Sequence, residues 1–351
     1  MHAFQLMGPN LGRYIEIDRP KPQDDELLIR VHRVGLCGTD VEMLHGTMPY
    51  FRLGWAKYPV VLGHEWSGTV VEVGQAVDNF AAGDRVTGDV TIGCGRCVNC
   101  MRGSYNLCVT KQEVGLCRGK NGAFAQYLTM PARHSYQLPA GVDLDDGALV
   151  EPTATVVKAI RKAGFEPGAT VLVTGDGPIG LLALQAAVAY GAGWVALSGT
   201  SPAKLALARQ FGANAVIDVR TQNPVECVMD LTRGLGVDYS IEASGHNQAL
   251  EHCFRATRQG GTISVVGIYE RPIEKLDMGM AVVRDLTISC SVASPNAFEQ
   301  TLRLMAAGKI KAKPMVTHVL DLADAPKAFE IQQTQAEHRI KIHLRPPPAA
   351  E

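Results

Sequence analysis

The 351-residue sequence has no excess of charge of one sign, and apart from the short Pro346-Pro347-Pro348 tail it has no internal repeat or low-complexity segment. Its 34 basic and 35 acidic side chains nearly cancel, so no overall positive field is available to hold nucleic acid or an anionic membrane. The N-terminus has no basic stretch followed by an apolar run, which predicts a cytoplasmic protein without a signal peptide. The expected partners are therefore small molecules, and the nine cysteines are expected to stay reduced.

Long hydrophobic runs are also scarce. Residues 179–198 form a stretch without charged side chains that has about the length of a membrane span. Gly191 and Gly193 interrupt it, and each remaining piece has the length of a buried helix or strand. We therefore predict no membrane segment.

The length predicts about two domains, at roughly 150 residues each. Residues 1–150 carry short β-rich runs, such as Leu27–Val34 and Val60–Val73, separated by Gly, Pro and Asp. From Thr170 onward, strands alternate with helical segments, which is typical of a doubly wound parallel sheet. The pattern weakens past Arg284. The sequence thus predicts an α/β fold with a mostly β first domain, to which the C-terminal segment returns.

One loop contains four cysteines with C-x2-C-x2-C-x7-C spacing: Cys94, Cys97, Cys100 and Cys108. Four thiolates in a short irregular segment are typical of a structural, tetrahedral Zn²⁺ site. The first part of this spacing also opens the cysteine run of bacterial ferredoxins. In those proteins, however, the fourth cysteine follows after three residues and precedes a proline, whereas Val109 follows here. The spacing favours zinc over an iron–sulfur cluster.

Cys37 and His64 indicate a second metal site. Both are flanked by glycines, in Gly35-Leu36-Cys37-Gly38-Thr39-Asp40 and in Gly63-His64-Glu65. His64 alone is more typical of a structural histidine. A thiolate, an imidazole and a carboxylate together leave one tetrahedral position open, as in catalytic zinc sites. The candidate carboxylates are Glu65 and Glu151.

A glycine-rich turn follows the strand expected at 170–174 and opens an apolar helix. It contains Gly175, Gly177 and Gly180 in a G-x-G-x-x-G pattern, with Pro178 and Ile179 between the last two. The first glycine allows a tight turn, the second a close approach to a pyrophosphate, and the third close packing of helix and strand. In this context the pattern predicts a dinucleotide site.

Taken together, these motifs resemble the zinc-containing medium-chain alcohol dehydrogenase family, in its sorbitol, threonine and sugar dehydrogenase branch. The resemblance also rests on C-G-T-D at 37–40, G-H-E-x2-G-x5-G at 63–74, G-D-R-V at 83–86 and Glu151-Pro152. It implies a GroES-like catalytic domain formed by residues 1–153 and 287–351, with the zinc lobe at 94–108. The Rossmann domain is expected at 154–286.

The resemblance implies two zinc ions per chain and assigns roles at the catalytic one. Cys37, His64 and either Glu65 or Glu151 would hold it, and the choice stays open because the family exchanges the two glutamates. Thr39 would pass the alcohol proton to the nicotinamide ribose. The alternative for Thr39 is a capping hydroxyl for a helix that begins near Asp40.

The coenzyme prediction depends on the end of the second Rossmann strand, where NAD-binding proteins place an acidic residue. Alignment with relatives puts Gly199 there. Without that carboxylate a 2′-phosphate is not repelled, and Thr200, Ser201 and Lys204 offer hydroxyls and a positive charge. We therefore predict NADP(H) over NAD(H), with an NAD-dependent threonine or sorbitol type as the alternative.

The substrate class comes from the resemblance alone: a polyol, sugar or amino alcohol, or its carbonyl. Relatives commonly carry a histidine where this chain has Glu42, which makes Glu42 a candidate contact for a substrate hydroxyl. His45 and Tyr50 are further candidates, or ordinary loop residues. The arginine–tyrosine pair of sorbitol-type relatives aligns with Ala293-Ser294, which argues against sorbitol itself.

Two other readings stay open: a metal-free reductase of the same superfamily, and a non-enzymatic NADP-binding protein that has kept the fold. A zinc-ribbon protein that binds nucleic acid is disfavoured by the balanced charge. Relatives are commonly dimers or tetramers, so we expect a homo-oligomer.

Overall fold

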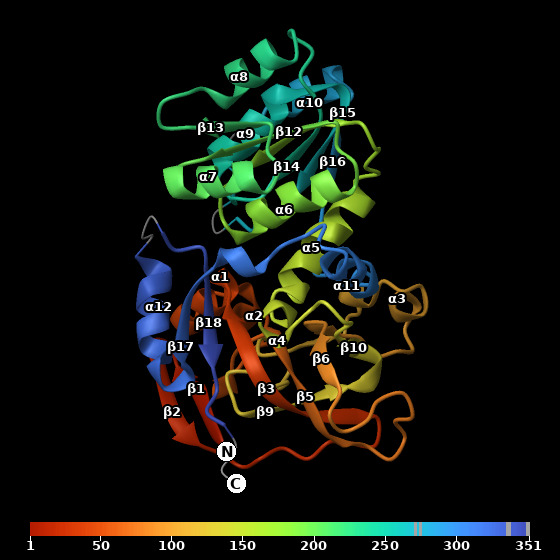
Figure 1. The fold of residues 1–351 in the computed structure, drawn as a ribbon, viewed down its shortest axis with the longest axis vertical. Helices are drawn as coiled ribbons and strands as arrows, with labels where there is room; N and C mark the ends of the chain where they lie inside the picture. The colour runs from red at the N-terminus through yellow and green to blue at the C-terminus, as the bar shows by residue number, and fades with distance from the viewer. Residues whose placement is uncertain (270–271, 274–275, 335–337, 349–351) are drawn as a thin grey trace. The chain divides into compact units, whose positions relative to one another are not determined.

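The computed structural model describes residues 1–269, 272–273, 276–334 and 338–348 (Figure 1). The chain forms two compact units. The first contains Met1–Glu151, Ala293–Ala306 and Ala312–Glu351, and the second contains Pro152–Val292 and Ala307–Lys311.

The first unit is built around a mostly antiparallel sheet with strand order β10-β6-β5-β3-β18-β17, in which β9 also pairs with β3. A smaller sheet has the order β2-β1-β4, and β7 pairs with β8. The strands of the first unit are β1 His2–Gly8, β2 Leu11–Glu16, β3 Glu26–Leu36, β4 Val60–Val61, β5 Glu65–Val73, β6 Arg85–Gly88, β7 Thr91–Ile92, β8 Gln112–Glu113, β9 Tyr127–Pro131, β10 Ser135–Gln137, β17 Val316–Asp321 and β18 Lys341–Arg345.

Short helices connect these strands, because glycine and proline interrupt the chain too often for long ones. They are α1 Gly38–His45, α2 Pro49–Arg52, α3 Val98–Met101, α4 Leu144–Gly147, α11 Phe298–Ala306 and α12 Ala325–Gln333. The core of the first unit is mostly aliphatic and contains four aromatic side chains that are almost fully buried: Phe4, Trp66, Phe124 and Phe329. The central strand β3 pairs with β5, β9 and β18, so its C-terminal end, just before Cys37, is held from both sides.

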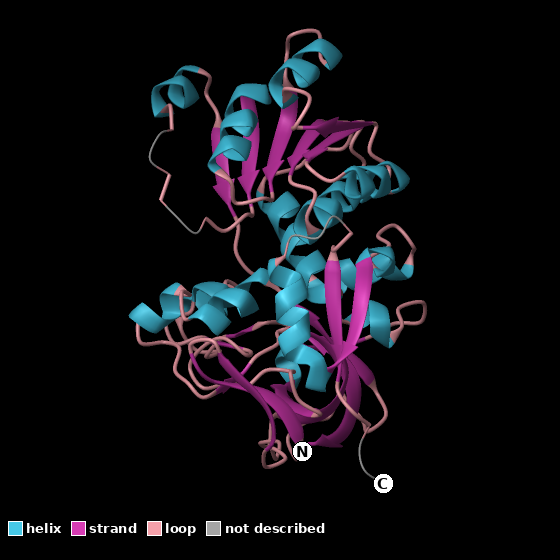
Figure 2. Cartoon of the chain, turned by 90° about the vertical axis from the view of Figure 1, so that its left-hand side faces the viewer, coloured by secondary structure: helices cyan, strands magenta, loops and turns pink. Residues whose placement is uncertain are grey.

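The second unit has a parallel sheet of order β13-β12-β11-β14-β15-β16, which confirms the predicted doubly wound α/β architecture (Figure 2). Helices α6, α7 and α9 pack against its strands. The elements are α5 Val150–Lys162, β11 Thr170–Thr174, α6 Pro178–Ala189, β12 Trp194–Gly199, α7 Pro202–Gln210, β13 Ala215–Asp218, α8 Pro224–Leu231, β14 Val237–Glu242, α9 Asn247–Ala256, β15 Thr257–Val265, α10 Met278–Val283 and β16 Thr287–Cys290.

The boundaries of the units differ from those expected from the sequence. The sequence predicts residues 287–292 in the catalytic domain, but β16 pairs in parallel with β15, with Thr287 beside Thr262, and therefore extends the second sheet. The first boundary lies after Glu151 rather than after residue 153, and α5 runs across it. The apolar run 179–198 forms α6 and β12, and none of the described helices has the length and hydrophobicity needed to cross a membrane.

Candidate functional site

Cys37 stands where β3 ends and α1 begins, as the N-cap residue of the helix. The side chain three residues later closes this turn, because Asp40 Oδ2 accepts a hydrogen bond of 2.9 Å from the Cys37 backbone N–H. A capping box of this kind fixes the direction in which the chain enters the helix. The thiol of Cys37 is therefore presented by a rigid turn, and Asp40, rather than Thr39, caps α1.

His64 directly precedes β5, Glu65 is its first residue, and both lie close to Cys37. One ligand atom from each of the three residues lies within 4.8 Å of the ligand atoms of the other two. Both His64 and Glu65 are buried. A sulfur, an imidazole nitrogen and a carboxylate oxygen at these separations fit a zinc ion with a fourth position open to a substrate or water.

Asp40 supports this cluster from behind. Its Oδ1 lies 3.7 Å from His64 Nδ1, and the Asp40 side chain is fully buried. Burial alone lowers the pKa of His64, but Asp40 and Cys37 outweigh it and hold that pKa well above its usual value. Burial raises the pKa of Asp40. A carboxylate beside the second nitrogen of a metal-binding histidine orients the ring, so Asp40 fits the role of a positioning residue.

Lys341 on β18 forms an ion pair with Glu65 Oε2, and both side chains are almost completely shielded from solvent. Burial lowers the pKa of Lys341, but Glu65, Cys37 and Asp40 outweigh it, so the pKa is raised overall. Gly35 faces this pair, because a Cβ there would lie 2.2 Å from Glu65 Oε2. The Glu65 carboxylate is therefore held by a neighbouring cation and by a glycine that leaves it room.

Glu151, the other candidate carboxylate, lies in the first turn of α5 and is buried. It is not one of the three clustered residues, but its charge acts on His64. Burial raises the pKa of Glu151 to about 8.

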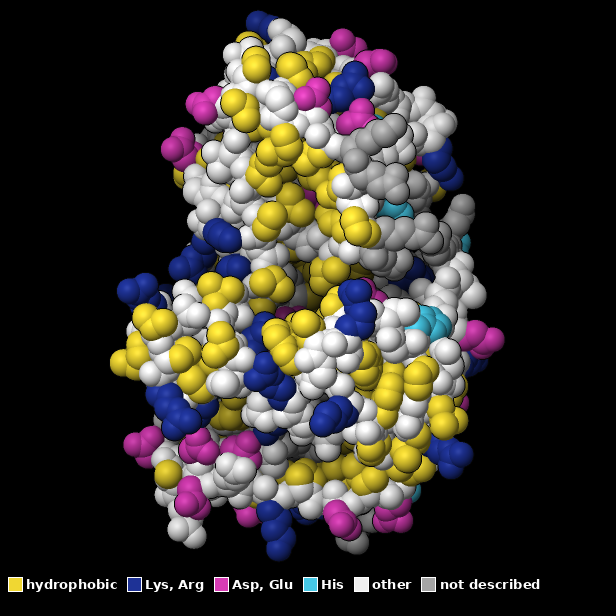
Figure 3. Space-filling view, turned by 180° about the vertical axis from the view of Figure 1, so that it is seen from behind, with side chains coloured by type: hydrophobic (Ala, Val, Ile, Leu, Met, Phe, Trp, Pro, Cys, Tyr) yellow, Lys and Arg dark blue, Asp and Glu magenta, His cyan; other side chains and the backbone are white. Residues whose placement is uncertain are grey.

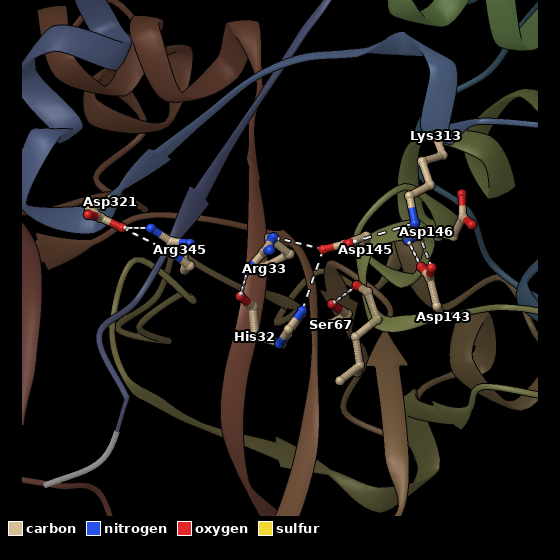
Figure 4. A network of polar contacts seen from close by, with 10 residues as sticks. His32, Arg33, Ser67, Asp143, Asp145, Asp146, Lys313, Asp321 and Arg345 are labelled. Atoms are coloured by element: carbon tan, nitrogen blue, oxygen red, sulfur yellow. Dashed lines mark hydrogen bonds and ion pairs between the residues drawn. The ribbon is translucent and has the colours of Figure 1, made fainter.

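Ion pairs anchor the segment that leads to Glu151. Asp145 Oδ1 lies 2.8 Å from Nε of Arg33 on β3, and Asp143 Oδ2 lies 2.7 Å from Lys313 Nζ (Figure 4). Ser67 donates a hydrogen bond to the Leu144 carbonyl in the same segment. These contacts fix α4 against β3 and β5 and so place the residues that follow it.

The four loop cysteines also come together. The four sulfur atoms all lie within 4.8 Å of one another; they belong to Cys94, Cys97, Cys100 and Cys108. The backbone N–H groups of Arg96 and Cys97 lower the pKa of the Cys94 thiol to about 6. Four sulfurs at these separations match the donor set of a closed structural zinc site.

The remaining candidates differ in their surroundings. Thr39 Oγ1 lies 3.8 Å from Cys37 Sγ, next to the cluster. Glu42 lies half-buried on α1. The ring of His45 instead contacts Asn10 Oδ1 at 2.6 Å and Gln333 Oε1 at 3.0 Å. Burial and a hydrogen bond with Glu113 raise the pKa of Tyr50. His45 and Tyr50 are thus engaged by side chains of their own unit.

The glycine-rich turn has the form that the sequence predicts. Gly175 adopts φ +114°, which side chains rarely allow, and a Cβ on Gly180 would lie 1.9 Å from the Gly175 carbonyl oxygen. Gly177 is the N-cap of α6, with Pro178 in its first turn and Ile179 next. A Cβ on Gly177 would meet nothing within 4 Å, so the space beside the N-cap of α6 is open, as a phosphate-binding turn requires.

At the end of β12 the structure shows a contact that the sequence analysis did not consider. Asp176 Oδ2 accepts hydrogen bonds of 2.7 Å from both the Thr200 and the Ser201 backbone N–H. A Cβ on Gly199 would lie 2.5 Å from the Asp176 Cβ and Oδ2. The end of β12 has no acidic residue of its own, but the carboxylate of Asp176, from the glycine-rich turn, lies there.

A parallel-sheet dinucleotide unit, together with a β unit that carries a thiolate–imidazole–carboxylate cluster, defines a zinc-type dehydrogenase. The family model described as "Alcohol dehydrogenase GroES-like domain" matches residues 23–140, and the one described as "Zinc-binding dehydrogenase" matches residues 178–307. The chain belongs to the zinc-containing medium-chain alcohol dehydrogenase family, in its sorbitol and threonine dehydrogenase branch, and is an oxidoreductase that acts on alcohols.

Relatives match over nearly the full length. Sorbitol dehydrogenase of Bacillus subtilis is 31% identical over 328 residues, 93% of this chain and 92% of that protein. L-threonine 3-dehydrogenase of Pyrococcus horikoshii is 33% identical over 354 residues, covering 98% and 99%. A protein from Sinorhizobium meliloti 1021, whose crystal structure has NADP bound, has a TM-score of 0.89 and 32% identity over 98% of this chain and 99% of its own.

Proposed function

We propose that this protein transfers a hydride between a polyol, sugar or amino alcohol, or the corresponding carbonyl compound, and a nicotinamide dinucleotide, with a catalytic zinc held by Cys37, His64 and Glu65. The convergence of these three side chains within 4.8 Å is the observation that carries the proposal. A metal-free reductase would have no use for a half-buried thiol beside a buried imidazole and a buried carboxylate.

The chain's own residues have distinct tasks in this reaction. A bound zinc ion would supply a Lewis acid that lowers the pKa of the alcohol, and a bound nicotinamide would supply the hydride acceptor. Asp40 orients His64, and Lys341 holds Glu65. Thr39, beside Cys37, is the hydroxyl that relays the alcohol proton. Glu151 is a buried carboxyl in the first turn of α5, and it remains the alternative zinc ligand.

Two relatives of the sorbitol and threonine dehydrogenase types support a substrate with more than one polar group. Glu42, on the helix that begins at Cys37, is the proposed contact for a second hydroxyl or an amino group. His45 and Tyr50 are further substrate candidates; the ring of His45 contacts Asn10 and Gln333, and Tyr50 forms a hydrogen bond with Glu113.

The coenzyme has two candidates. The glycine at position 199 and the NADP-bound relative favour NADP(H), with Thr200, Ser201 and Lys204 around its 2′-phosphate. The Asp176 carboxylate, at the same strand end, favours NAD(H).

We also propose a homo-oligomer that associates through the second unit. Apolar side chains on and after α10 are exposed, including Val282 and Val283, and β16 is the edge strand of the sheet. Figure 3 shows hydrophobic side chains gathered on this unit. An exposed apolar patch beside an open sheet edge favours pairing with a second copy. Light scattering should give a dimer or tetramer that Val283→Lys weakens.

Metal analysis and a substrate panel test the proposed activity. The purified protein is expected to hold two zinc ions per chain, and Cys37→Ser only one. Polyols, sugars and aminocyclitols should reduce the coenzyme with the native protein, but not with Cys37→Ser. Full turnover by that variant would refute the catalytic site.

A further inference from the structure

We infer that Asp176 recognises the 2′ position of the adenosine ribose, and that it favours the free hydroxyl of NAD(H) over the phosphate of NADP(H). The inference rests on the proposed function, because it assumes that the Gly175–Gly180 turn holds a dinucleotide. Its basis is the position of this carboxylate at the end of β12.

The sheet register explains how Asp176 reaches that position. β11 and β12 are parallel neighbours with Thr174 opposite Ser198, so both strands end at the same edge. Asp176 comes just after β11, and Thr200 just after β12. Its Oδ2 binds the backbone N–H groups of Thr200 and Ser201, each at 2.7 Å. The carboxylate thus stands at the end of the second strand, where NAD sites need an acid, although it comes from the turn after the first.

Gly199 supports this interpretation. A Cβ at Gly199 would lie 2.5 Å from Asp176 Cβ and Oδ2 and 2.6 Å from Cγ. Glycine is therefore needed at this strand end because the Asp176 side chain fills the space above it. Position 199 lacks an acid because the Asp176 side chain already places a carboxylate there. The glycine at position 199 therefore does not by itself leave space for a 2′-phosphate.

The charges of Asp176 and Arg220 point the same way, whereas Lys204 is the cation that a phosphate would need. A 2′-phosphate carries about −1.5 to −2 charges, and it would compete with Asp176 for the same two N–H groups. Arg220 is already held by Asp218, the strand-end residue paired with Gly199, through bonds of 2.9 and 2.7 Å. A ribose hydroxyl, in contrast, can donate to Asp176, since a carboxylate has about four acceptor sites and two are used here.

The first test replaces Asp176 by Asn, which keeps an accepting oxygen for the two N–H groups and removes the charge. Calorimetry on the zinc-loaded protein would measure the Kd of NAD⁺, NADP⁺, 5′-AMP and 2′,5′-ADP. The native protein is expected to bind NAD⁺ and 5′-AMP more tightly than their 2′-phosphorylated counterparts. In Asp176→Asn the ratio of the NADP⁺ and NAD⁺ dissociation constants should fall by at least about tenfold, or 1.4 kcal/mol.

The matched control is Glu251→Gln, which removes the same charge from an exposed position on α9. It should leave the ratio unchanged. Native protein that binds 2′,5′-ADP tenfold more tightly than 5′-AMP, or an unchanged ratio in Asp176→Asn, would overturn the inference while leaving the dehydrogenase proposal intact. A native protein that binds neither dinucleotide would overturn both.

A second pair of variants does not depend on Asp176→Asn folding well. Gly199→Asp alone should weaken the binding of both coenzymes, because its side chain strikes Asp176. Adding Asp176→Ala should restore NAD⁺ binding, because the carboxylate then returns to the strand end. If the Gly199→Asp single variant, which keeps Asp176, bound NAD⁺ more tightly than the native protein, the proposed role of Asp176 would be contradicted.

Discussion

Replacing Lys341 by Met is expected to destabilise the metal-free protein by about 3–5 kcal/mol. Lys341 and Glu65 form an ion pair in which the side chains are only 4% and 2% exposed. Methionine keeps most of the apolar stem of lysine but leaves the Glu65 carboxylate buried without a cation. The cost of an unpaired buried charge is what sets this magnitude, rather than the strength of the pair itself.

Zinc should reduce this loss. Glu65 is also one of the three clustered ligand residues, so a bound cation would compensate the carboxylate that Lys341 leaves behind. The variant is therefore expected to gain more stability from zinc than the native protein does. Urea denaturation in chelator and in zinc would measure both effects. In a Trp194→Phe background, the fluorescence of Trp55 and Trp66 reports on the first unit alone.

Arg303→Met is the control, because it breaks an ion pair with Glu299 in which both side chains are 76% exposed. It should change stability by no more than about 0.5 kcal/mol. If Lys341→Met costs less than about 1 kcal/mol without metal, Glu65 finds water or another partner, and the reasoning about a desolvated pair is wrong.

Three further predictions concern metal, proton transfer and pH. Cys97→Ser should lose one zinc per chain, measured by atomic emission, and lower the melting temperature while the catalytic zinc is retained, since the two cysteine sites use separate residues. Thr39→Ala should lower kcat by about 10²–10⁴-fold with unchanged zinc content. The side chain that closes the turn at the start of α1 is that of Asp40, not that of Thr39. A Thr39→Ala variant that keeps its activity but loses stability would contradict the relay. Burial, with Arg133 nearby, lowers the pKa of His134 to about 4. Its folded pKa lies below the unfolded one, so its contribution is present above pH ~6.5 and declines toward pH ~4, by about 2 kcal/mol between pH 7 and pH 5; His134→Leu should lose that part of the pH dependence in urea titrations.

Local motifs made the fold and much of the site predictable. The four cysteines and the glycine-rich turn were found from spacing, because their partners lie within one short segment. Asp40 was missed although its position three residues after Cys37 is that of a capping box. Lys341 had no local signal, because only the pairing of β18 with β3 brings it to the cluster.

Asp176 shows a different reason for a missed residue. It occupies a position that the G-x-G-x-x-G pattern leaves undefined, and its contact depends on the register of β11 and β12. The predicted domain boundary at residue 287 differs from the structure for a similar reason, because strand β16 is identified by its pairing with β15 rather than by its own short sequence.

Helix α1 joins two distant parts of the first unit. Its first turn presents Cys37, and its last residue, His45, is bonded to Gln333 at the end of α12. A metal ion bound at Cys37 should stabilise the start of α1 and should therefore slow amide hydrogen exchange at both ends of this helix. Exchange in α12 would then report metal occupancy, and peptide-level measurements can follow it without any substrate.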